Sequence, residues 1–143
     1  MVKLPKKLIA EGNKLFGYTN WDHGSGGSGF AAGVALYDNL QDAWEANEVA
    51  SIDFEEMPGC CGIVIFTNLQ VDVKNKGYGE FVTKIAEYYA ADDGYTLAIA
   101  TTNNKAGAKI ALALGATEAA SFTNRKTQHP IKVWTKKLPA KTR

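Results

Sequence analysis

Apolar residues recur with two different periods along this chain, and the change of period marks its elements. In residues 49–55 apolar and polar side chains alternate, which is typical of a half-buried strand. A denser apolar run at residues 62–69 predicts a second, more central strand, and the break at residues 57–59 predicts an antiparallel hairpin. In residues 80–91 the apolar positions return at helical spacing, which predicts a helix.

The C-terminal half alternates between strand and helix patterns. It predicts a strand at residues 95–100, a helix after Asn104 running to residue 114, and strands at residues 116–122 and 131–135. A strand–helix–strand crossover is almost always right-handed and joins parallel strands. We therefore expect strands 62–71 and 95–100 to lie side by side.

The N-terminal part gives weaker signals. Residues 5–16 fit a short amphipathic helix, whereas residues 18–29 are so rich in glycine and serine that they predict a loop. Residues 30–36 fit either a strand or the start of a helix. Residues 40–46 predict a helix.

Length and composition favour one compact unit. A chain of 143 residues with 45% hydrophobic content suits a single domain over residues 1–143 and is too short for two ordinary ones. We expect an α/β (α+β) fold with a mixed, mostly antiparallel central sheet and helices on both faces. The formal net charge of +1 argues against nucleic acid as a partner. Because no apolar run reaches membrane-spanning length and the N-terminus lacks a signal-peptide core, we predict a cytoplasmic protein without a membrane partner.

The cysteines and histidines offer neither a disulfide nor a metal site. Cys60 and Cys61 are adjacent, and neighbouring residues rarely reach the geometry of an ordinary disulfide. His23 and His129 lie far from them and from each other, so no metal is expected. We expect the cysteines to pack as small apolar side chains.

A turn of glycines and basic residues joins the central strand to the helix at 80–91. It consists of Lys74, Asn75, Lys76, Gly77, Tyr78 and Gly79. A strand that ends in such a turn and opens a helix directs several backbone N–H groups and the positive end of a helix dipole at one place. That place favours an anion, typically a phosphate. The glycines by themselves also fit a tight turn, so the flanking elements must decide.

These elements and their joints resemble the GNAT superfamily of acyl-CoA-dependent N-acetyltransferases over about residues 60–138. The pyrophosphate loop of that family has Gln or Arg, two residues, Gly, one residue, and Gly or Ala. Here Lys74, Gly77 and Gly79 fill these places. Lysine keeps the charge of the usual first residue but lacks the planar fork of arginine.

The resemblance implies further ligand contacts and one departure. It implies that the backbone of Leu69 and Val71, at a splayed strand end, pairs with the pantetheine arm of CoA. Asn104 fills the place of an asparagine that follows the next strand, where it would also serve as an ordinary helix cap. Many members later carry a tyrosine that protonates the departing thiolate. This chain has Ala111 there, which cannot donate a proton.

An attacking amine must also lose a proton, so a carboxylate or a water chain is expected near the acyl group. The candidate catalytic residues are Asp53 and Glu55. They lie on the solvent side of the strand at residues 49–55, which precedes the strand that leads into the glycine turn. A solvated strand face is the alternative interpretation.

The resemblance therefore implies an acetyl-CoA-dependent N-acetyltransferase that uses no metal and acts on a small-molecule or peptide amine. The short N-terminal half is more similar to small phage-type members of the superfamily than to typical bacterial ones. The alternative is a catalytically inactive module of the same fold that binds CoA or a protein or nucleic-acid partner. Ala111 favours this alternative, and the intact glycine turn opposes it. A homodimer is left open, as are the acceptor and the role of residues 21–29.

Overall fold

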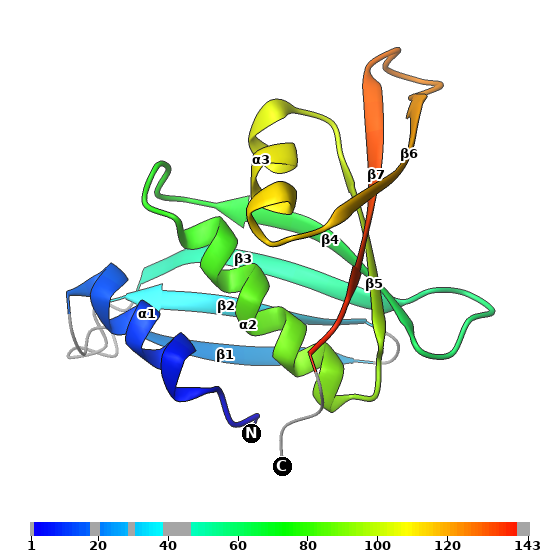
Figure 1. Cartoon of the computed structure of the whole chain (residues 1–143). Helices are drawn as coiled ribbons and strands as arrows, with labels where there is room; N and C mark the ends of the chain where they lie inside the picture. The colour runs from blue at the N-terminus through cyan, green and yellow to red at the C-terminus, as the bar shows by residue number, and fades with distance from the viewer. Residues whose placement is uncertain (1, 18–20, 29–30, 39–46, 140–143) are drawn as a thin grey trace.

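The structure is a computed structural model that describes residues 2–17, 21–28, 31–38 and 47–139. Seven strands form one sheet in the order β1-β2-β3-β4-β5-β7-β6 (Figure 1). They are β1 (Trp21–Ser28), β2 (Ala31–Asp38), β3 (Asn47–Glu56), β4 (Ile63–Val71), β5 (Leu97–Thr102), β6 (Thr117–Thr123) and β7 (Pro130–Lys137). All neighbours are antiparallel except β4 and β5, which are parallel. The mixed, mostly antiparallel sheet and the parallel central pair confirm the sequence predictions.

Three helices are described: α1 (Lys6–Phe16), α2 (Tyr78–Asp92) and α3 (Lys105–Ala113). α1 and α2 lie on one face of the sheet, where α2 crosses β2, β3 and β4 (Figure 1). These three helices confirm the predictions from residues 5–16, 80–91 and 104–114. The helix predicted at residues 40–46 lies outside the described residues. No helix in the described ranges is long and apolar enough to cross a membrane.

The glycine-rich segment is a strand, so the loop predicted there is wrong for the described residues. β1 pairs with β2 over its whole length, from Trp21 opposite Asp38 to Ser28 opposite Ala31. Glycine weakens strand propensity, but pairing along a neighbouring strand supplies hydrogen bonds whatever the side chain. Alternate residues anchor the strand: Trp21 packs edge-on against Phe81, and its Nε1 donates a hydrogen bond to Asn13 Oδ1 at 2.9 Å. Of the ambiguous run at residues 30–36, residues 31–36 are described and are likewise a strand.

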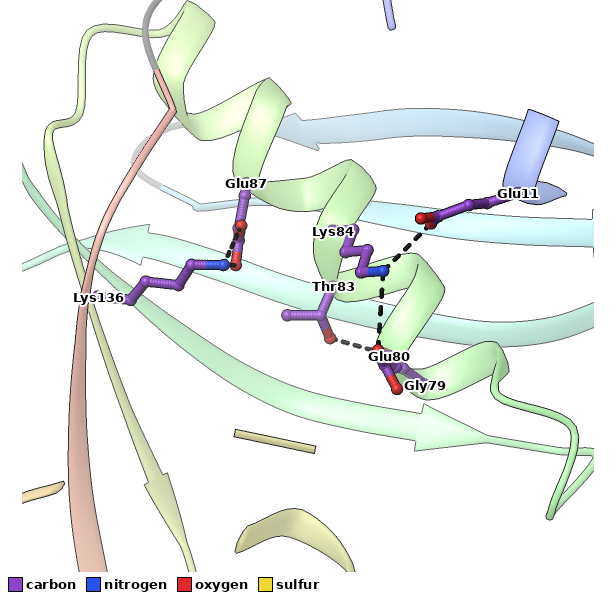
Figure 2. Close-up of polar contacts among 7 residues, drawn as sticks. All are labelled: Glu11, Gly79, Glu80, Thr83, Lys84, Glu87 and Lys136. Atoms are coloured by element: carbon purple, nitrogen blue, oxygen red, sulfur yellow. Dashed lines mark hydrogen bonds and ion pairs between the residues drawn. The ribbon is translucent and has the colours of Figure 1, made fainter. Parts of the chain in front are cut away.

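The core lies between the sheet and α2. One stripe of α2 packs against alternate residues of β2, β3 and β4. The central residues of this core are Val34, Leu36, Ile52, Val64, Phe81, Val82 and Ile85. Two charged contacts tie further elements to α2 (Figure 2). Lys84 Nζ contacts Glu11 Oε2 of α1 at 3.1 Å, and Lys136 Nζ of β7 contacts Glu87 Oε1 at 2.8 Å. α2 is therefore the element on which α1 and β7 are fixed.

The two cysteines lie in the turn between β3 and β4, which projects from the sheet (Figure 1). Both thiols are free; Cys60 is half-buried and Cys61 is exposed. The expected apolar packing is wrong for Cys61, which is exposed in the turn two residues before β4 begins at Ile63.

Candidate functional site

The central strands β4 and β5 stop pairing before either strand ends. Their parallel register runs from Ile63 opposite Leu97 to Phe66 opposite Ala100. Beyond this point β4 continues against β3, and β5 continues against β7. The edge of β4 that faces β5 therefore has no strand partner beyond Phe66 within the described sheet. An unpaired strand edge can receive the hydrogen bonds of an extended ligand.

A β-bulge in β4 lies at this separation. Ser51 pairs with Gln70 and Asp53 pairs with Thr67, so one β3 residue opposes both Asn68 and Leu69. Asn68 has a left-handed φ of 52°, which asparagine tolerates better than most residues. The bulge reverses which side chains face α2. The sequence carries a signal of the bulge, because the apolar positions shift from 64 and 66 to 69 and 71.

The basic glycine turn leads from this strand end into α2. Lys74, Asn75 and Lys76 are exposed, as is Gly77, the N-cap residue. Asn75 and Gly77 have left-handed φ values of 64° and 84°. Among the described residues no side chain caps the start of α2, so none of them occupies its first backbone N–H groups. With two lysines beside them, these groups can bind an anion.

Gly79 is buried where α2 meets β4 and α3. A Cβ at this position would lie 2.9 Å from Val71 Cγ2 and 3.2 Å from Ile110 Cδ1, so glycine permits the close approach. The neighbouring Tyr78 stacks on Phe16 with ring centroids 4.8 Å apart. Burial raises the pKa of the Tyr78 phenol, and the Asp38 carboxylate adds to this effect. The Tyr78 side chain therefore packs in the core, and its backbone is the part available to a ligand.

Asn104 is the N-cap of α3. Its Oδ1 accepts a hydrogen bond from the backbone N–H of Gly107 at 2.7 Å. This hydrogen bond establishes that the Asn104 side chain caps α3. A contact between Asn104 and a ligand remains a prediction. Two exposed lysines of α3, Lys105 and Lys109, add positive charge to this helix. Ala111 is half-buried on α3 and has no proton to donate.

The structure separates the two candidate carboxylates. Asp53 and Glu55 are both exposed on β3, at positions that alternate with the buried Ile52 and Phe54. Asp53 is paired with Thr67, the first β4 residue past the β4–β5 pairing. Glu55 is paired with Ile65, which still pairs with β5. Asp53 therefore lies beside the separated strands, and Glu55 lies further along the closed part of the sheet.

The histidine of the sheet lies outside this region. His23 is on β1, and its ring packs against Tyr89 with centroids 5.7 Å apart. Its two ring nitrogens are buried and have no hydrogen-bond partner among the described residues. Burial lowers the pKa of His23, although the Asp22 carboxylate opposes this. Over the described ranges no group of three or more His, Cys, Asp or Glu residues is placed to hold a metal ion.

Comparison with known proteins identifies the fold. No family model and no curated protein matches the sequence. Among solved structures, a Desulfovibrio desulfuricans protein assigned to the GNAT family is 10% identical, with 76% of this chain and 69% of that chain covered and a TM-score of 0.65. The ribosomal-protein-S18-alanine N-acetyltransferase of Escherichia coli is 12% identical, with 81% and 74% covered and a TM-score of 0.62. Nourseothricin acetyltransferase is 11% identical, with 76% and 66% covered and a TM-score of 0.64. The expected fold is thereby confirmed.

Proposed function

Because this chain has the fold of the GNAT acetyltransferases, we propose that it is an acetyl-CoA-dependent N-acetyltransferase acting on an amine. The observation that carries the proposal is the separation of β4 from β5 directly beside the uncapped start of α2. An unpaired strand edge and an anion-binding helix start, placed together, suit a ligand with an extended polar arm and a pyrophosphate.

Residues 74–79 and the end of β4 would hold acetyl-CoA. The pyrophosphate would bind the turn, where Gly77 and the two lysines are exposed. The pantetheine arm would pair with the backbone of Leu69 and Val71, whose side chains pack against the core. Gly79 supports this placement because it lets the helix start lie against the strand end.

Asp53 is the carboxylate that we assign as the proton acceptor. The amine nitrogen would lose its proton to Asp53, directly or through one water, and form a bond to the thioester carbonyl carbon. The carbon–sulfur bond then breaks and the thiolate leaves. Ala111 cannot protonate that thiolate, so we assign this proton to water. Glu55 is the weaker candidate because it lies along the closed part of the sheet.

The distribution of charge favours a cationic acceptor. Residues 15–73, which include β1–β4, contain nine Asp or Glu residues and no Lys or Arg. Residues 74–143 contain twelve Lys or Arg residues and five Asp or Glu residues. The basic part holds the proposed site for the polyanionic CoA, and the acidic part holds Asp53. A protonated amine would therefore be attracted to the side on which its proton acceptor lies.

The test is calorimetric titration with acetyl-CoA, followed by a thiol-release assay on a panel of amines. The panel should include lysine-containing peptides, peptides with free N-termini and aminoglycoside-like polyamines, because the structural neighbours include acetyltransferases named for a ribosomal protein and for nourseothricin. Binding with turnover supports the proposal. Binding without turnover on any amine supports the alternative, a non-enzymatic CoA-binding module, which Ala111 favours. Absence of binding contradicts both.

A further inference from the structure

The carboxylate of Asp53 is contacted from both neighbouring strands. On the β4 side, Asn68 Nδ2 donates a hydrogen bond to Asp53 Oδ2 at 3.2 Å. On the β2 side, Gly33 pairs with Asp53, and a Cβ built on Gly33 would lie 2.7 Å from Asp53 Oδ1. The carboxylate therefore lies over Gly33 with one oxygen bonded to Asn68.

The bulge in β4 delivers the Asn68 amide to Asp53. In an unbroken strand, residue 68 would follow Val64 and Phe66 on the face that packs against α2. The extra residue of the bulge and the left-handed φ of Asn68 instead leave its side chain exposed, within reach of β3. The same irregularity that marks the strand separation thus supplies a donor to the carboxylate beside it.

Packing against β3, and not the backbone conformation, explains why residue 33 is glycine. It has no left-handed φ, so its backbone conformation is open to other residues. A Cβ would lie 3.1 Å from the backbone oxygen of Ile52 and would meet Asp53 Oδ1. A contact of 2.7 Å is shorter than real Cβ atoms show, so a side chain at this position must displace the carboxylate.

We propose that Asn68 and Gly33 are positioning residues for Asp53. Asn68 fixes Oδ2, and Gly33 leaves room for Oδ1, which accepts no hydrogen bond within the described part of the chain. Oδ1 is then the oxygen that receives the proton of the acceptor amine. This inference rests on the proposed function in one respect, namely that Asp53 takes that proton.

Two substitutions test the proposal, and each suits the backbone conformation at its position. Asn68→Gly removes the amide while tolerating the left-handed φ, and Gly33→Ala adds the Cβ that meets Oδ1. Each should lower kcat about tenfold, a part of the effect of general-base catalysis, and leave the Kd of acetyl-CoA unchanged. The matched control is Gly24→Ala on β1, where the new Cβ would contact Tyr37 Cε2 at an ordinary 3.7 Å. It should change kcat less than about twofold.

A double-mutant cycle separates positioning from general damage. In an Asp53→Asn background, Asn68→Gly and Gly33→Ala should cause no further loss of kcat, because they act through a group already removed. Full additive losses in that background would overturn the inference. An unchanged kcat in the two single variants would also overturn the inference. An unchanged kcat in Asp53→Asn would overturn it as well, but would leave the acetyltransferase assignment in place.

A second measurement needs no turnover. The side-chain amide resonances of Asn68 in ¹⁵N-labelled protein should move in Asp53→Ala and Gly33→Ala and stay in place in Gly24→Ala. If the wild-type protein transfers no acetyl group to any amine, the proposed function fails, and these resonances still decide whether Asn68 and Gly33 hold Asp53. Resonances that do not respond to Asp53→Ala would refute the contact.

Discussion

The buried ring of His23 makes a pH-dependent contribution to stability. Its side chain is 12% exposed and packs against Tyr89 and Trp21. Burial is the larger influence and lowers its pKa, with Asp22 opposing. In the unfolded chain the pKa returns to about 6.5, so below that pH the unfolded state binds more protons than the folded state. Stability is therefore complete above about pH 6.5 and is lost as the pH falls from there toward the folded-state pKa.

We predict that the free energy of unfolding falls between pH 7.5 and pH 5.5, by up to about 1.4 kcal/mol per pH unit from His23. Urea unfolding followed by circular dichroism measures it. His23→Phe, which keeps a ring against Tyr89, should flatten this part of the profile. His129→Gln is the control, because that histidine is exposed, and it should leave the slope unchanged. Equal slopes for the wild type and His23→Phe would contradict the assignment.

Gly77 offers a direct test of the anion site. A Cβ at Gly77 has room, its nearest atom being Leu15 Cδ1 at 3.8 Å, but the φ of 84° strains any side chain. Gly77→Asn and Gly77→Asp share this strain and nearly the same shape, and they differ in charge. We predict that Gly77→Asp raises the Kd of acetyl-CoA more than about tenfold over Gly77→Asn, because its carboxylate repels phosphate at a helix start. Equal values from calorimetry would remove the pyrophosphate from this turn.

The sequence predicted these individual positions unevenly. The turn at residues 74–79 is a local pattern, so its place between strand and helix could be read directly. Asp53 could be named because it alternates with buried neighbours on one strand. Asn68 and Gly33 could not, because their roles depend on which residues face them across β2, β3 and β4. Cross-strand contacts of this kind depend on the register between strands, which the residues next to Asn68 or Gly33 in the sequence do not reveal.

The link between α2 and β7 is an ion pair in which the carboxylate is buried and the lysine is half-buried. Lys136 Nζ donates to both carboxylate oxygens of Glu87, at 2.8 and 2.9 Å (Figure 2). Glu87 is only 6% exposed, and burial raises its pKa despite the opposing effects of Lys136 and Lys84. Removal of the lysine would leave a carboxylate in the core without this partner, which is costly.

We predict that Lys136→Met lowers the free energy of unfolding by about 3 kcal/mol, and that Glu87→Met/Lys136→Met recovers most of the loss. Lys132→Met on the same strand is the control. It breaks a pair with Glu118 whose side chains are 50% and 45% exposed, so it should cost less than about 1 kcal/mol. Urea unfolding compares the variants. Equal losses for Lys136→Met and Lys132→Met would mean that the buried pair does not fix β7.

Elements with a long periodic pattern could be predicted, and elements defined by a neighbour could not. α2 and the β3–β4 hairpin follow from their own spacing, because each buries a face that its sequence marks. The sequence of β1 predicts a loop because three of its eight residues, Gly24, Gly26 and Gly27, are glycine and two more are serine. Its strand depends on pairing with β2 and on the anchoring rings of Trp21 and His23, which are tertiary contacts.

Acidic and basic residues lie in different segments of the chain, which the net charge does not show. The formal net charge of +1 is the sum of an acidic segment, residues 15–73, and basic segments on either side of it. The acidic segment contributes four neighbouring strands of the sheet, and most lysines of the basic C-terminal segment lie in the turn, α3 and β7. The total charge alone indicates no strong electrostatic field, but the order of strands places the two signs of charge on different parts of one molecule.

This separation predicts how acetyl transfer should respond to salt. For a lysine-containing peptide acceptor, KM should rise several-fold when the ionic strength is raised from about 0.02 to about 0.15 M, because the Debye length falls to about 8 Å and screens attraction to the acidic strands. The matched acceptor has the same free amine and glutamine in place of each lysine, and its KM should change little. The Kd of acetyl-CoA, measured separately, accounts for the effect of salt on the basic part. If both peptides respond equally once that effect is subtracted, the acidic strands do not select the acceptor, and the preference for a cationic amine fails while acetyl transfer itself stands.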